Sequence, residues 1–175
     1  GRLSPYLLQP VFPFWRYFSS HIAEQFSRFP IVVLLMIVIS LTVPHAMWKP
    51  TSLDIILFLI ATFTAFCVRF LLHWLFAMTC FWNERSSAIE RLLLIPYLFL
   101  SGLVAPLEAF PSFIRNCAFL TPFPYILSFP CKLLAGQEVN ISESFRILFL
   151  WAIVLMALSY YFWKKGVRHY SGMGA

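Results

Sequence analysis

Two residues that can carry charge, Arg69 and His73, lie inside an apolar segment of residues 55–82. They are four positions apart, so they share one face of a helix. A charge at the centre of a membrane costs on the order of 3 kcal/mol on insertion scales, so such side chains turn to a protein interior, a cavity or an interface. The pair therefore either lines a substrate path or includes an arginine that reaches to the nearer interface. The second interpretation is slightly favoured, because the segment exceeds the thickness of a bilayer.

The other residues that could do chemistry form no catalytic pattern. The sequence contains no GxxxxGK[ST], GxSxG or HExxH motif, so no phosphate-binding loop, serine nucleophile or zinc-protease site is expected. Glu108 can be protonated, pair with Arg115 or face water, and facing water is favoured. His45 fits a hydrated position at the membrane surface. We expect no catalytic residue, metal or cofactor in this chain, although a small membrane enzyme that uses Arg69 and His73 is a minor alternative.

The composition is that of an integral membrane protein. Of 175 residues, 61% are hydrophobic and 11% are charged, against about 25% charged in ordinary soluble domains. Such a chain has too little polar surface to cover itself in water. The net charge of +6 suits basic loops on the inner side of a membrane. The basic residues are spread among loop ends, which argues against nucleic-acid binding. The four cysteines lack zinc-ligand spacing, and a disulfide between Cys117 and Cys131 is a minor alternative to free thiols.

The stretch from Pro106 to Pro130 is apolar, but five prolines interrupt it. Proline removes a backbone donor and clashes with the preceding helical turn, so only short helices are predicted, over Ser112–Leu120 and Tyr125–Ser128. Broken backbone at membrane depth persists only where protein or a water-filled cavity covers it. The sequence therefore predicts a re-entrant helical hairpin over residues 106–130, with a proline-rich surface loop as the alternative.

An apolar stripe runs along residues 14–29. It repeats at helical spacing and consists of Phe14, Phe18, Ile22, Phe26 and Phe29. Charged and small polar residues fall on the other faces of the same predicted helix, which should lie along the membrane interface. This pattern supports two interpretations equally well: the helix is an anchor before the first span, or it is a surface that docks a cytoplasmic partner.

These elements combine into an all-α integral membrane fold with about four transmembrane helices. The predicted spans cover residues 30–48, 55–82, 92–105 and 145–163, and the polar stretch 83–91 is a loop. Basic residues concentrate in residues 1–29, in that loop and in the tail, with fewer on the other side at Lys49, Arg115, Lys132 and Arg146. The excess of Lys and Arg in inner loops places both termini in the cytoplasm and the hairpin on the outer face.

Several motifs resemble the permease of a type-2 ATP-binding-cassette (ABC) exporter, closest to a bacterial subfamily. The tail of that subfamily, Gly-x-x-x-Tyr-Ser-x-x-Gly, is matched by GVRHYSGMG at residues 166–174. Further similar segments are PLEAFP at 106–111, TPFPY at 121–125, Pro130 followed by Gly136, and GRLSPYLLQP at 1–10. Family permeases have six spans, so the chain resembles the carboxy-terminal two thirds of one, and the missing pair would precede Gly1.

The resemblance implies a location in the bacterial inner membrane and a mechanism. Two permease subunits, alike or different, would pair above two cytoplasmic ABC ATPase subunits, which would bind and hydrolyse the ATP. The coupling segment would be residues 14–29, with Arg16, Phe18, Ile22, Glu24 and Arg28 as contacts. The extracellular gate would be the hairpin, with Pro106, Glu108, Pro111, Pro122, Pro124 and Tyr125. The substrate is not readable from the sequence, and a non-transporting membrane scaffold or assembly factor is the main alternative.

Overall fold

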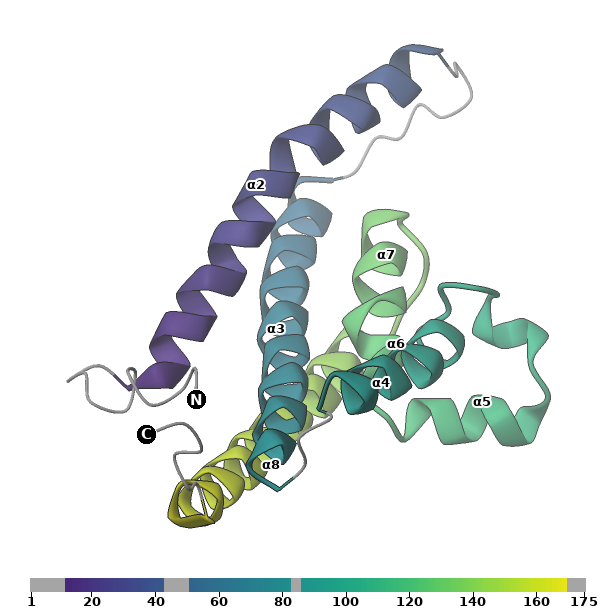
Figure 1. Ribbon diagram of the computed structural model, residues 1–175. Coiled ribbons are helices and arrows are strands. Elements are labelled where there is room, and N and C mark those ends of the chain that lie inside the picture. Colours follow the sequence, from purple (N-terminus) through teal and green to yellow (C-terminus); the bar gives the residue numbers. More distant parts are fainter. Residues whose placement is uncertain (1–11, 43–50, 83–85, 170–175) are drawn as a thin grey trace. The chain divides into compact units, whose positions relative to one another are not determined.

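The computed structural model describes residues 12–42, 51–82 and 86–169, and within these ranges the regular structure is entirely helical (Figure 1). The chain divides into two units, Gly1–Lys49 with Ser171–Ala175, and Pro50–Tyr170. The predicted features at residues 1–10, at His45 and Trp48, and at the end of the tail lie outside the described residues.

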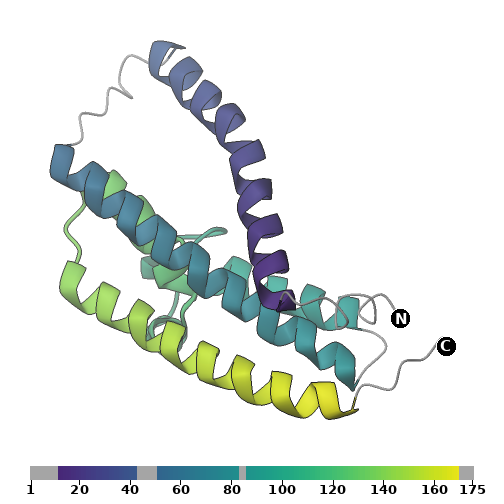
Figure 2. The same cartoon turned by 90° about the vertical axis from the view of Figure 1, so that its left-hand side faces the viewer.

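The first unit contributes the helix α2, Pro13–Thr42. It runs through Pro30 without ending, where the sequence predicted the boundary between an interfacial helix and a span. An interior proline removes one hydrogen bond and kinks a helix without necessarily ending it, and Figure 2 shows α2 bending along its length. The predicted boundary at residue 30 is thus corrected: the amphipathic stretch and the first apolar stretch are one helix. Its residues 13–39 are long and apolar enough to cross a membrane.

The second unit is organised around the helix α3, Ser52–Ala77. The helix begins three residues earlier than predicted, because the backbone N–H of Thr51 donates to the carboxylate of Asp54 at 3.0 Å and so fixes its first turn. It gives way at residue 78 to the 3₁₀ turn η2, Met78–Phe81. The predicted 28-residue span is therefore a shorter α-helix with a 3₁₀ extension.

The helix α8, Ile141–His169, is longer than its predicted span of residues 145–163. Asn140 caps it, since its side-chain oxygen accepts a hydrogen bond from the backbone N–H of Glu143 at 3.2 Å. The amide nitrogen of Asn140 also donates to the Glu143 carboxylate at 3.0 Å. Together these bonds satisfy polar groups at the start of the helix.

α8 packs along α3, and the two helices run side by side in Figure 2. Ala61 and Ala65 are buried on α3, and Leu148 and Leu155 are buried on α8. Small residues let helix backbones approach closely in a membrane protein. The rings of Trp74 and Trp163 stack 5.6 Å apart, so the carboxyl ends of both helices lie at the same end of the unit.

The helix α4, Ser86–Leu100, has 15 residues and contains Pro96. At about 1.5 Å per residue it is about 22 Å long, shorter than the ~30 Å hydrocarbon core, and it is not among the helices that qualify as spans. The predicted span of residues 92–105 is corrected in its bounds: the helix begins inside the predicted polar loop and ends five residues early. Gly102 follows with a φ of +82°, a backbone conformation that glycine adopts without strain.

The proline-rich stretch forms four short helices. They are η3 (Leu107–Ala109), α5 (Ser112–Phe119), α6 (Phe123–Ile126) and α7 (Ser128–Leu134). α5 agrees with the predicted Ser112–Leu120. The helix that was predicted over Tyr125–Ser128 is wrong in its bounds, because Pro124 and Pro130 lie in first turns, where a missing N–H costs no intrahelical bond. The axis bends by 67° between α5 and the α6–α7 pair.

Gly166 on α8 allows a close approach to η2. A Cβ atom at this position would overlap the aromatic ring of Phe81. We predict that Gly166→Ala destabilises the folded chain by about 1–3 kcal/mol, because overpacking forces neighbouring groups to move. The check is the apparent unfolding temperature of the purified chain in detergent.

Ser142→Ala, at an exposed position of the same helix, serves as the matched control and should leave that temperature unchanged. Combining Gly166→Ala with Phe81→Leu should cost less than the sum of the two single changes, since contacting residues couple. Simple additivity in this double-mutant cycle would refute the predicted overlap.

Candidate functional site

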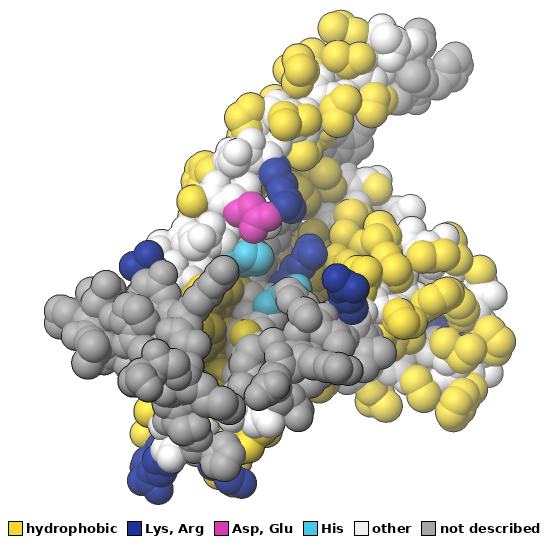
Figure 3. Space-filling model, in the orientation of Figure 1, with side chains coloured by type: hydrophobic (Ala, Val, Ile, Leu, Met, Phe, Trp, Pro, Cys, Tyr) yellow, Lys and Arg dark blue, Asp and Glu magenta, His cyan; other side chains and the backbone are white. Residues whose placement is uncertain are grey.

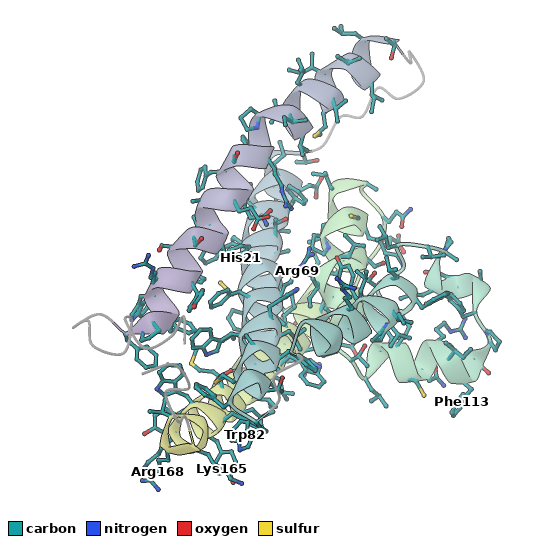
Figure 4. All side chains as sticks on the ribbon, viewed as in Figure 1. His21, Arg69, Trp82, Phe113, Lys165 and Arg168 are labelled. Carbon is teal, nitrogen blue, oxygen red and sulfur yellow. The ribbon has the colours of Figure 1, made fainter. Side chains whose placement is uncertain are left out.

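A cavity of about 390 Å³ lies where α3, α4 and α6 meet in the second unit. Such a volume is within the range of small-molecule sites, roughly 300–1,000 Å³. Figure 4 shows Arg69 on the side of α3 that faces α4 and α6. The cavity is lined by Arg69, Leu72, His73, Arg91, Leu93, Leu94, Tyr97, Phe123 and Ile126. The two residues singled out on α3 thus line one cavity with residues from two other helices.

Arg69 is held against an aromatic ring. Its guanidinium carbon lies 5.0 Å from the ring centroid of Tyr97, within the range of a cation–π interaction. Its backbone carbonyl lies 2.8 Å from Nδ1 of His73. A carbonyl oxygen only accepts hydrogen bonds, so in this arrangement the proton is on Nδ1 of His73. The Arg69 head group therefore has a defined position inside the cavity.

Arg91 is a basic residue of this cavity that the sequence did not suggest as part of a site. It was assigned to the polar loop of residues 83–91, but it lies on α4, which contacts α3. Nothing local in the sequence relates it to Arg69, which is 22 positions away. Only the return of the chain at η2 brings these two basic residues to one cavity.

The proposed gate residues lie in the proline-rich residues 106–134, which comprise η3 and α5 to α7 and are called the α5–α7 segment here, and the structure brings the two ends of this segment together. Nζ of Lys132 on α7 donates to a carboxylate oxygen of Glu108 in η3 at 2.6 Å. Arg115, the partner considered for Glu108, is not its hydrogen-bonding partner. No local sequence pattern indicates the ion pair of Glu108 with Lys132, because 24 residues separate them.

A second cavity, of about 320 Å³, lies between the same two ends. It is lined by Ser101, Gly102 and Leu103 before the segment and by residues of α7 and Gln137 after it. The stretch of chain that enters the segment and the stretch that leaves it therefore lie side by side.

The prolines and Tyr125 shape this segment. Pro106 and Pro111 are exposed and precede η3 and α5, whereas Pro122, Pro124 and Tyr125 are buried. The hydroxyl of Tyr125 donates to the carbonyl of Phe119 at 3.3 Å. Cys117 and Cys131 are free thiols, so the disulfide alternative is not what the structure contains.

The residues of the predicted coupling segment lie on α2, in the first unit. Arg28 and Glu24 form an ion pair one turn apart, and the rings of Phe14 and Phe18 stack at 6.0 Å. Ile22 follows Phe18 on the same stripe, and Arg16 is exposed. Its carbonyl accepts a hydrogen bond from the Ser19 hydroxyl at 2.9 Å.

Aromatic and basic residues gather at the carboxyl ends of α3 and α8. Trp163 contacts the rings of both Trp74 and Phe81. Figure 4 labels Lys165 and Arg168 at the same end of α8, and both are exposed. Tryptophan and basic residues together are typical of a membrane–water interface on the inner side.

Three helices are long and apolar enough to cross a membrane, and four if the bent pair of α5 with α6–α7 counts as one crossing. Large apolar side chains stay exposed along these helices, such as Phe63 on α3 and Ile153 on α8, as expected of surfaces that face lipid. The fold therefore defines a multi-pass α-helical membrane protein.

A comparison with known protein families matches residues 1–174 to the family described as ABC-2 family transporter protein. The chain belongs to this family, whose members are the membrane components of ABC transporters and associate with an ATP-binding subunit. Further comparisons with curated proteins and with solved structures found no match.

The ion pair of Glu108 with Lys132 predicts a pH dependence. The hydrogen bond and charge of Lys132 hold the pKa of Glu108 below its ordinary value. A carboxyl with a lowered pKa contributes stability above its unfolded pKa and loses it as the pH falls through the folded value. The pair is largely exposed, with 60% of the Glu108 side chain accessible, so we expect Glu108→Gln to cost about 0.5 kcal/mol at pH 7.

The measurement is the unfolding temperature in detergent at neutral pH and at a pH below the pKa of Glu108. The deficit of Glu108→Gln should disappear in acid. Glu138→Gln, at an exposed position beyond α7, should show no deficit at either pH. An equal deficit at both pH values would mean that the charge of Glu108 contributes nothing.

Proposed function

We propose that this chain is the permease subunit of an ABC exporter, which moves a substrate across the bacterial inner membrane with ATP hydrolysed by a separate subunit. The observation that carries the proposal is the family match over residues 1–174. The cavity between α3, α4 and α6 supports it, because transport requires a place where substrate can bind inside the helix bundle. In this proposal the chain itself needs no cofactor, and ATP binds in the partner.

Transport by this design requires more than one membrane subunit. Two permease subunits, either identical or different, pair above two cytoplasmic ATPase subunits. Closure of the ATPase dimer on ATP then changes the arrangement of the spans. A substrate bound beside Arg69 and His73 is thereby exposed to the opposite side of the membrane. Coupling of this kind needs a bistable arrangement of helices that both the ATP and the substrate bias.

The amino-terminal part of α2 serves as the coupling surface. It carries exposed charged side chains, Arg16, Glu24 and Arg28, next to the aromatic side chains Phe14 and Phe18. A polar rim beside aromatic anchors is the usual composition of a protein interface. Ile22 extends the apolar side of this surface by one more turn.

Both termini of the chain are cytoplasmic in this proposal. The carboxyl ends of α3 and α8 lie together, as the stacking of Trp74 on Trp163 requires. The basic residues Lys164, Lys165 and Arg168 near the end of α8 therefore lie at the same end of the unit as the carboxyl end of α3. Basic segments favour the cytoplasmic side, which supports this orientation.

The α5–α7 segment is a re-entrant hairpin at the outer face and helps to close the exit. The ion pair of Glu108 with Lys132 joins the start of the segment to its end, as a hairpin that returns to one face requires. The buried residues Pro122, Pro124 and Tyr125 hold its turn, whereas Pro106 and Pro111 direct the chain into η3 and α5.

Charge reversal on α2 tests the coupling surface. We predict that Arg16→Glu with Arg28→Glu lowers recovery of the ATPase with the purified chain at least tenfold, because removal of buried charge pairs at an interface costs 2–5 kcal/mol. The amount of chain inserted in the membrane should stay unchanged. The ATPase is identified by mass after a pull-down of the tagged native protein in mild detergent.

Arg115→Glu with Arg146→Glu is the matched control, since both are exposed or half-exposed residues of the second unit and lie on the predicted outer side. Full recovery of the ATPase with the α2 variant would remove α2 as the coupling surface. Absence of any ATPase from the wild-type complex would overturn the permease proposal and favour a scaffold.

A further inference from the structure

The cavity between α3, α4 and α6 combines basic side chains with an apolar lining. Its lining contains the basic side chains of Arg69 and Arg91, with His73 beside them, and the remaining lining residues are apolar or aromatic. We propose that it binds an anionic amphiphile, a molecule with a phosphate or carboxylate head on an apolar body. This inference deepens the proposed transport function and rests on it where the ligand is called a substrate.

Within the described part of the chain, the guanidinium groups of Arg69 and Arg91 have no protein carboxylate as a partner. Among the described residues, no carboxylate lines the cavity, and neither guanidinium makes an ion pair or a side-chain hydrogen bond. Arginine carries five N–H donors in a planar fork that matches an oxyanion. Both arginine side chains are exposed, so a ligand can reach these donors. A ligand oxyanion would satisfy the donors and compensate the charges.

The position of Arg69 is suited to this role. The guanidinium carbon lies over the Tyr97 ring, 5.0 Å from its centroid, and this cation–π contact uses none of the N–H groups in a hydrogen bond to an acceptor atom. Among the described residues the Arg69 side chain donates no hydrogen bond, so its N–H groups can form paired hydrogen bonds to a phosphate or carboxylate. Tyr97 thus restricts Arg69 before any ligand arrives, which lowers the entropic cost of binding.

The apolar wall is built by residues from all three helices. Phe123 and Ile126 of α6 and Leu72 of α3 are largely buried, and Leu94 of α4 is 54% exposed. Figure 3 shows dark-blue basic side chains beside an extended yellow surface in the region of α4–α6. A small hydrated anion would gain nothing from this wall, whereas an apolar body gains about 25 cal/mol for each Å² buried.

The level of the cavity relative to the membrane surface also fits an amphiphile. Arg69 precedes Trp74 by five residues, or roughly 7 Å along α3 at 1.5 Å per residue. Trp74 belongs to the aromatic group that marks the interface at this end of the bundle. The basic groups therefore lie near the level of lipid head groups, with the apolar wall extending from them.

The test measures binding to the full-length purified chain in detergent micelles without any ATPase. The probe is dioleoyl phosphatidic acid, and dioleoylglycerol is its neutral counterpart with the same acyl chains. Native mass spectrometry gives the bound fraction of each. We expect phosphatidic acid to bind at least tenfold more tightly, and Arg69→Gln with Arg91→Gln to abolish that preference.

Two variants serve as controls. Arg115→Gln with Arg146→Gln removes the same charge elsewhere in the unit and should leave binding unchanged. Arg69→Lys with Arg91→Lys keeps the charge and should retain most of the preference. Should the double glutamine variant not fold, the single variant Arg91→Gln is judged by the same criterion of weakened binding.

Three results would overturn the inference. They are equal binding of both lipids, unchanged binding in the glutamine variants, and displacement of phosphatidic acid by inorganic phosphate at a comparable concentration. The last would assign the cavity to a soluble anion. Since no ATPase is present, failure here leaves the permease proposal standing, and failure of ATPase recovery leaves this result unaffected.

Discussion

The need to satisfy backbone hydrogen bonds away from water governs the second unit of this protein. A straight helix such as α8 meets this need internally, but the broken chain of α5–α7 does not. Side chains add hydrogen bonds to the last carbonyls of α5, one of which also accepts a backbone bond from Thr121 at 2.9 Å. The hydroxyl of Thr121 donates to the carbonyl of Ala118 at 2.6 Å, and that of Tyr125 donates to the carbonyl of Phe119 at 3.3 Å. The break is tolerated because these groups are bonded and α6 is buried.

The cavity is a consequence of that broken segment. α6 is too short to be stable alone, and its contacts with α3 and α4 bring Phe123 and Ile126 opposite Arg69. A continuous helix through residues 112–134 would leave no such inward turn. The same prolines that prevent a regular helix therefore create the apolar wall beside the basic residues, so the broken segment and the cavity are parts of one structure.

The sequence predicted the helical class and the family, because apolar runs and local motifs carry that information. It also predicted α5 well, since Pro111 and the turn at Leu120 bound it on both sides. The helix that continues through Pro30 and the first-turn positions of Pro124 and Pro130 were missed. A proline in the sequence shows that a backbone N–H donor is missing, but it does not show whether a helical hydrogen bond requires a donor at that position. The pairing of Glu108 with Lys132 and the approach of Arg91 to Arg69 depend on tertiary folding and have no local signal.

The path of the chain between α3 and α8 determines the membrane topology of this protein. These helices run in the same direction, so the chain between them must return across the membrane once. We propose that α4, which is too short to cross alone, makes that return together with the turn after it, and that α5–α7 enters and leaves at the outer face. The alternative is that α4 stays at the inner face and α5–α7 crosses as a broken span.

Cysteine labelling with a membrane-impermeant maleimide in intact cells distinguishes the two. Single cysteines replace Leu103, before the segment, and Gln137, after it, in a chain without its native cysteines. The account predicts that both are labelled from outside. Labelling of position 137 alone, with position 103 reactive only after the membrane is opened, would contradict it.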